Sequence, residues 1–211
     1  MQGSVKIARR NVLTVGLGLA LAVNVLDVRA AEGTGSSLDT IKTLQATLVD
    51  SARRLGKAPV AERYRALEPA IVKTHNLPYI AEFALRRQWP MLTDGERQRF
   101  VAAFQRLSVM TYAARFGNVA PDAFRPLEAR MPDANGREQV TTAIKRDGQP
   151  DVSLEYLLQQ DGDDWKIINI VADGVSDLAL KRAEYQRLFA SGGIEGLIAE
   201  LERQTDHLEN G

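Results

Sequence analysis

The segment that most constrains the fold of this chain spans residues 151–176 and carries two strand patterns. In the first, over residues 152–159, apolar and polar side chains alternate, and only Leu157 breaks the alternation. The second is apolar on both of its expected faces, with Trp165, Ile167 and Val171 on one and Ile168 and Ile170 on the other. Since a strand that is apolar on both faces is covered on both, we expect other elements to pack on each side of a sheet.

The rest of the chain supplies further strands and many amphipathic helices. Strand-like runs at about residues 124–131, 139–145, 152–159 and 165–171 are separated by short turn signals, which favours an antiparallel meander. Helical periodicity precedes and follows these runs, and Thr93 and Glu96 form a capping box at the start of the longest predicted helix, about residues 94–116. We therefore predict an α+β fold: a four-stranded antiparallel sheet covered by about six helices, cone-shaped and NTF2-like, with an apolar cavity.

The N-terminal 30 residues have the layout of a secretory signal peptide. Basic residues precede an apolar run from residue 12 to about residue 25, and Val28 and Ala30 offer small side chains for cleavage. Sec export and twin-arginine export both remain open. We predict a signal peptide at 1–30, a flexible mature N-terminus at 31–37, a single domain at 38–203 and a polar tail at 204–211.

Charge and composition exclude several classes of function. The whole chain has 27 basic and 27 acidic residues, and removal of residues 1–30 takes away four cations and one anion, which leaves a net charge of −3. A protein of that charge is a poor match for a nucleic-acid partner. The chain has no cysteine, so an exported form is stabilised by its core and not by disulfides.

The sequence contains few reactive groups. It has two histidines, no G-x-S-x-G nucleophile motif, no phosphate-binding glycine loop and no cluster with metal-ligand spacing. We interpret His75 as the C-terminal residue of a helix and Glu155 as a solvated strand residue. A binding protein without a cofactor or metal is therefore the leading interpretation, with a small enzyme that uses His75 or a buried acid, and a plain interaction module, as alternatives.

Several segments together resemble the MlaC (toluene-tolerance) family. They are residues 164–170 with 174–176, Tyr185 and Phe189, residues 193–198, the run 75–89, and Thr93, Gln98, Arg99, Phe100, Phe104, Thr111 and Tyr112. The resemblance covers about residues 38–201. The sequence departs from the family pattern at His75-Asn76, where Phe-Asp is common, at Arg86, where Gly is common, and by about four additional residues between Ser176 and Tyr185.

The resemblance implies a periplasmic lipid carrier. Members of the family hold the acyl chains of a phospholipid between sheet and helices and leave the head group in solvent. They move lipid between an outer-membrane lipoprotein complex and an inner-membrane ABC transporter complex. Residues 176–182 are also similar to the hopanoid-associated HpnM branch, so a hopanoid or another polycyclic lipid stays open as the ligand.

On this hypothesis we predict that the lipid contacts apolar faces of the sheet and of two helices. The predicted sheet residues are Leu127, Ala129, Val140, Thr142, Ile144, Val152, Leu154, Tyr156, Leu158, Ile168 and Ile170. The predicted helix residues are Phe83, Phe100, Phe104, Leu107 and Met110.

Overall fold

The structure is a computed structural model that describes residues 36–146 and 148–211. The predicted signal peptide and residues 31–35 of the predicted mature N-terminus lie outside these ranges. None of the helices within the described ranges has the length and apolar character needed to cross a membrane.

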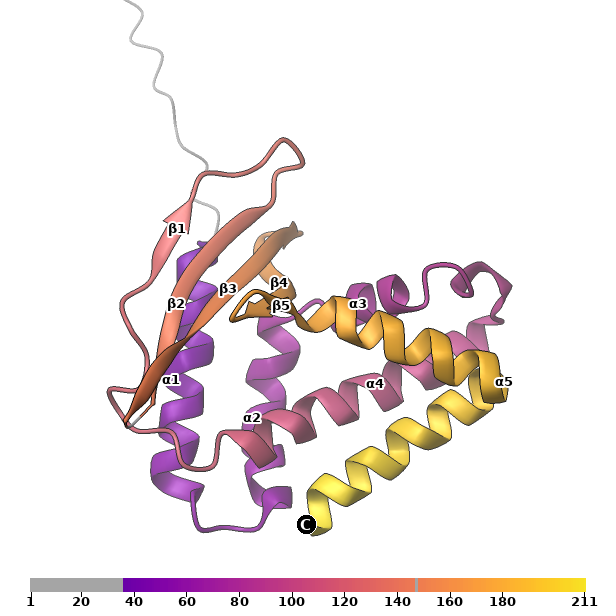
Figure 1. Ribbon diagram of the computed structural model, residues 1–211, viewed down its shortest axis with the longest axis horizontal. Coiled ribbons are helices and arrows are strands. Elements are labelled where there is room, and N and C mark those ends of the chain that lie inside the picture. Colours follow the sequence, from indigo (N-terminus) through magenta and orange to yellow (C-terminus); the bar gives the residue numbers. More distant parts are fainter. Residues whose placement is uncertain (1–35, 147) are drawn as a thin grey trace, which may run out of the picture. The chain divides into compact units, whose positions relative to one another are not determined.

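Helices make up most of the described chain (Figure 1). They are α1 (Ser37–Leu55), α2 (Val60–Thr74), α3 (Leu77–Ala84), the short 3₁₀ helix η1 (Trp89–Met91), α4 (Asp94–Arg115) and α5 (Asp177–Asn210). The predicted capping box at Thr93 and Glu96 is confirmed at the start of α4. α5 is kinked at Gly193, which has φ 63° and ψ −163° and divides the element into two helical halves. Residues 204–210, predicted as a polar tail, continue α5, and Thr205 among them is buried.

The strands form one antiparallel sheet in the order β1-β2-β3-β4-β5. They are β1 (Glu128–Arg130), β2 (Glu138–Arg146), β3 (Gln149–Asp161), β4 (Asp164–Ala172) and β5 (Val175–Ser176). The α+β class and the antiparallel meander are confirmed, but the described sheet has five strands, not four. Asp173 and Gly174 both have positive φ, 48° and 80°, as a two-residue hairpin turn requires. That turn adds β5, which is too short to produce a periodic sequence signal.

One face of the sheet packs against α1 and α2. Val140, Tyr156, Leu158 and Ile167 are at most 4% exposed and join the apolar faces of both helices in one hydrophobic cluster. Thr40 in α1 donates a hydrogen bond of 2.8 Å to the carbonyl oxygen of Trp165 in β4. Figure 1 shows these two helices lying along the sheet, and we call this side the packed face.

A β-bulge in β4 changes which of its residues share a face. Leu157 pairs with Asn169 and Leu158 pairs with Ile167, so Ile168 is an extra residue between the two pairs. Ile170 pairs with Tyr156, which places Ile167 and Ile170 together on the packed face. The prediction that they lie on opposite faces, and that Ile168 and Ile170 share one, is therefore wrong. Strict alternation does not continue through a bulge.

The other side of the molecule is a helical layer in which α4 packs between α2 and α5. The rings of Phe100 and Phe104 in α4 meet Tyr185 of α5 edge to face, with centroids 6.0 and 6.2 Å apart. Aromatic pairs favour this geometry, and all three side chains are at most 1% exposed. This contact fixes the first half of α5 against α4.

Candidate functional site

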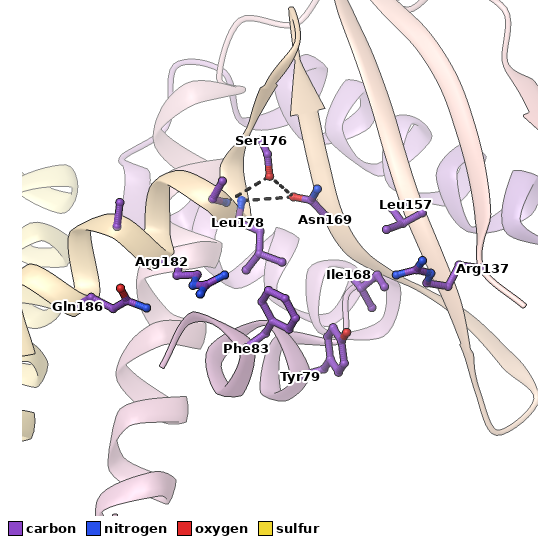
Figure 2. A pocket seen from close by; sticks show the side chains of 12 residues that line it. Tyr79, Phe83, Arg137, Leu157, Ile168, Asn169, Ser176, Leu178, Arg182 and Gln186 are labelled. Atoms are coloured by element: carbon purple, nitrogen blue, oxygen red, sulfur yellow. Dashed lines mark hydrogen bonds between the residues drawn. The ribbon is translucent and has the colours of Figure 1, made fainter. Parts of the chain in front are cut away.

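A pocket of about 530 Å³ lies between the unpacked face of the sheet, α3 and the first half of α5 (Figure 2). Most of its lining is apolar, and the polar groups come mainly from α5 and from the ends of strands. The lining residues are Tyr79, Phe83, Arg137, Leu157, Ile168, Asn169, Ser176, Leu178, Ala179, Arg182, Ala183 and Gln186. Ala179 and Ala183 are exposed, so the pocket opens at the surface along α5.

The bulge in β4 builds the floor of this pocket. It turns the side chains of Ile168 and Asn169 to the same side as Leu157, away from the packed face. The Oδ1 atom of Asn169 accepts hydrogen bonds from the backbone N–H of Leu178, at 3.2 Å, and from the Ser176 hydroxyl, at 3.1 Å. The Ser176 Oγ atom accepts from the Ala179 N–H at 3.2 Å and caps α5. One irregular strand position thus supplies an apolar floor residue and fixes the start of the α5 wall.

The opposite wall is α3, which is attached to the edge of β4. The Asn76 N–H donates to the carbonyl oxygen of Ile167 at 2.9 Å, and the Asn76 side chain caps α3. From α3, the rings of Tyr79 and Phe83 stack with centroids 6.0 Å apart. The guanidinium of Arg86 lies 5.6 Å from the centroid of the Phe83 ring, close enough for a cation–π contact. Two aromatic rings held in this way form a smooth apolar wall.

The charge of the pocket lining is positive. It contains Arg137 and Arg182 and no acidic residue. Arg137 is neutralised by Asp133, which lies 2.7 Å away, and the ion pair holds the pKa of Asp133 down to about 2. For Arg182, no carboxylate lies within ion-pair distance among residues 36–146 and 148–211. The lining therefore favours a ligand with an apolar body and an anionic group.

His75 is a structural residue at the end of α2, as the sequence predicts, and it does not line the pocket. It is 4% exposed, and its Nδ1 atom lies 3.1 Å from the carbonyl oxygen of Ile71. Because a carbonyl only accepts, Nδ1 carries the proton of the neutral ring, and Nε2 accepts from the hydroxyl of Tyr112 at 2.9 Å. Burial lowers the pKa of His75 to about 4. Burial also raises the pKa of Tyr112 well above its usual value, so both groups are neutral at pH 7.

The structure places two of the predicted lipid-contact residues, Phe83 and Ile168, on the pocket. Ala129 is exposed. The others lie in the hydrophobic core or pack against it: Phe100, Phe104, Leu107, Met110, Leu127, Val140, Thr142, Ile144, Val152, Leu154, Tyr156, Leu158 and Ile170. Thr142 shows how polar groups are accommodated there, because its hydroxyl donates to the carbonyl oxygen of Arg125 at 2.6 Å.

Ten lining residues were not among the predicted contacts, and some of them leave a trace in the sequence. Leu157 is the residue that breaks the alternation of β3, and an apolar side chain on a polar face is a signal for a second apolar contact. Leu178, Arg182 and Gln186 are spaced four residues apart and so lie along one side of α5. Within the residues that the structure describes, no group of three or more His, Asp or Glu side chains is placed to hold a metal ion.

The fold and the pocket define an α+β protein in which a small antiparallel sheet and two helices enclose an amphipathic pocket. The model of the MlaC protein family matches residues 39–203, and the chain therefore belongs to this family. The predicted resemblance to the family is thereby confirmed.

Among solved structures, the chain is similar to a phospholipid-binding protein from Ralstonia solanacearum in complex with a phospholipid. The TM-score is 0.69 and the sequence identity is 19%. The match covers 82% of this chain and 99% of the other. The two proteins therefore share the fold over nearly the whole length of the Ralstonia protein.

Proposed function

We propose that this protein is a lipid carrier of the cell envelope that binds phospholipid in the pocket between the sheet, α3 and α5. The observation that carries the proposal is the lining of that pocket: apolar side chains on the floor and on the α3 wall, and one arginine, Arg182, that is not paired with a carboxylate of the described residues. The Ralstonia protein of the same fold binds a phospholipid. As a member of the MlaC family, the chain would move lipid between an outer-membrane lipoprotein complex and an inner-membrane ABC transporter complex in the periplasm.

The energetics of such a carrier need no covalent step. Transfer of an acyl chain from water to an apolar wall is favourable by about 0.8 kcal/mol for each methylene group. The pocket volume of about 530 Å³ falls within the usual range of small-molecule sites, roughly 300–1,000 Å³. We propose that Phe83, Leu157 and Ile168 contact the acyl chains, because all three face the pocket. Contacts of the predicted residues on the packed face, such as Val140, Tyr156 and Leu158, would require an opening between the sheet and helices α1 and α2.

The proposal is tested by mass spectrometry of an organic extract of the purified mature protein. A phospholipid at a stoichiometric ratio is the expected result, and a hopanoid in its place would assign the ligand to the alternative branch. A protein that is free of lipid after native purification, and that takes up none from vesicles of phosphatidylglycerol and phosphatidylethanolamine, would refute the carrier function.

A variant that fills the pocket locates the lipid. Ala183→Trp places a large ring on the pocket lining from an exposed position, and Ala190→Trp places the same ring two turns further along α5, outside the lining. We expect the first variant to fold and to lose most of its lipid, and the second to retain it. Leu154→Trp enlarges a side chain on the packed face and should leave the lipid in place, unless the acyl chains enter that side of the sheet.

A further inference from the structure

The α5 wall of the pocket changes character along its length. Leu178, near the sheet, is apolar, and Arg182 and Gln186, one and two turns further on, are polar. Figure 2 shows Arg182 and Gln186 projecting from α5 on the side of the pocket, with the guanidinium of Arg182 directed toward the ring of Phe83. A ligand that follows this wall meets an apolar surface first and two hydrogen-bond donors beyond it.

Gln186 carries a donor that the described protein does not satisfy. Its Nε2 atom is buried and has no hydrogen-bond partner among the described residues. Three other buried side-chain atoms share this condition, on Gln45, Ser51 and Gln88, but only Gln186 lines the pocket. Because leaving a buried donor unpaired is costly, such a group indicates an acceptor that enters from elsewhere. Because Gln186 lines the pocket, we take a ligand in the pocket as the source of that acceptor.

Arg182 supplies a charge at the same place. Its side chain is half-buried on the lining, the lining has no carboxylate, and the carboxylates of the described residues leave it unpaired. The other arginine of the pocket, Arg137, is held by Asp133 through a hydrogen bond of 2.9 Å from its Nε atom. The neighbouring cation on α5, Lys181, is held by Asp177 at 2.6 Å. Arg182 is thus the cation that is available to a ligand anion.

We propose that Arg182 and Gln186 form a subsite for the phosphodiester group of the bound phospholipid, which gives the carrier a preference for lipids with a phosphate. The guanidinium would bind the phosphate oxygens and the Gln186 amide would donate to an adjacent oxygen. This inference rests on the proposed carrier function and adds to it a site for the head group, which the family resemblance alone leaves in solvent.

The test compares two lipids with identical acyl chains: phosphatidylglycerol, and diacylglycerol, which lacks the phosphate. The affinity of the delipidated protein for each is measured by fluorescence with an acyl-chain label. Arg182→Gln should weaken the binding of phosphatidylglycerol by roughly 10- to 100-fold, because one charge-assisted contact is lost. The affinity of the same variant for diacylglycerol should stay within about twofold of the wild-type value. Arg187→Gln, on an exposed position of α5 outside the lining, should change neither.

Three results would overturn the subsite. One is an equal loss of affinity for both lipids in Arg182→Gln, which would mean that Arg182 shapes the pocket and does not bind phosphate. Another is a loss of affinity for phosphatidylglycerol in Arg187→Gln that equals the loss in Arg182→Gln, which would mean that net charge is responsible. The third is displacement of phosphatidylglycerol by millimolar inorganic phosphate, which would assign the subsite to free phosphate. Failure of the wild-type protein to bind either lipid would instead refute the carrier function itself.

Gln186→Leu is an independent test, because it should change the stability of the protein and its affinity for phosphatidylglycerol in opposite directions. Removal of an unpaired buried donor should raise the melting temperature of the delipidated protein, since leucine has a similar size and no polar group to desolvate. The same change should weaken the binding of phosphatidylglycerol several-fold and spare diacylglycerol. A lower melting temperature, or unchanged binding of phosphatidylglycerol, would contradict the role given to Gln186.

Discussion

The buried, neutral state of His75 makes the stability of this protein depend on pH. In the folded protein the pKa of His75 is about 4, because burial disfavours the charged ring, whereas an unperturbed histidine has a pKa of 6.5. Between these two values the unfolded chain binds a proton that the folded protein does not. Stability is therefore complete above about pH 7 and decreases as the pH falls toward 4.

The size of the effect follows from the same two values. Each unit of pKa shift corresponds to about 1.4 kcal/mol, so a shift from 6.5 to about 4 corresponds to about 3 kcal/mol in total. About 2 kcal/mol of this is lost between pH 7 and pH 5. The lowered pKa values of Asp133 and Glu200, both about 2, affect stability below pH 4.5 and so do not contribute in this window.

The assay is urea unfolding of the wild-type protein and of His75→Gln at about pH 7, 6 and 5. We expect the free energy of unfolding of the wild type to fall by about 2 kcal/mol over this range, and that of the variant to change much less. The comparison uses the slope with pH and not the absolute stability, since the variant also loses the hydrogen bond with Tyr112. An equal slope in both proteins would show that His75 is not the group that titrates.

Two further predictions concern the stability of the fold. Arg63→Ala should lower the free energy of unfolding by about 2–4 kcal/mol, and Arg65→Ala, at an exposed position of the same helix, by less than about 0.5 kcal/mol. The reason is that the buried Arg63 side chain donates to the carbonyl oxygens of Ala113, Gly56 and Ala58, which chemical denaturation of both variants would test. Gly174→Ala, at φ +80°, should destabilise the β4–β5 turn by about 1 kcal/mol, whereas Gly95→Ala in α4 should stabilise the protein by about as much. Thermal melting of both variants tests this, and melting temperatures that shift in the same direction would contradict the prediction.

The elements of the fold could be predicted because each has a strong local signal. The capping box at Thr93 starts α4, and the two-faced apolar pattern of residues 165–171 correctly indicates a strand that is buried on both faces, at Ile167 and at Ile168. β5 has no such signal. Its two residues are ordered by the turn before them and by pairing with Val171 and Ala172, which is a tertiary effect.

The pocket could not be located from the sequence because it depends on the bulge. A strand that is apolar on both faces has no alternation for an extra residue to interrupt, so nothing in residues 165–171 shows where the phase changes. Strict alternation places Ile168 with Ile170, and the predicted contacts accordingly include both of them together with Leu154 and Tyr156. The structure packs that face against α1 and α2 and opens the opposite one.

The same bulge connects the fold to the proposed binding chemistry. By turning Ile168 and Asn169 to one side, it gives the pocket its apolar floor. It also places the side-chain Oδ1 atom of Asn169 where it accepts a hydrogen bond from the first turn of α5. The direction of α5 then determines where Arg182 and Gln186 lie, since both follow from that turn at intervals of four residues. A regular strand with the same composition would keep the hydrophobic core but lose both the floor and the anchor of the polar wall. The irregular position in β4, more than any single side chain, is therefore what would allow an apolar site and the proposed phosphate subsite to share one pocket.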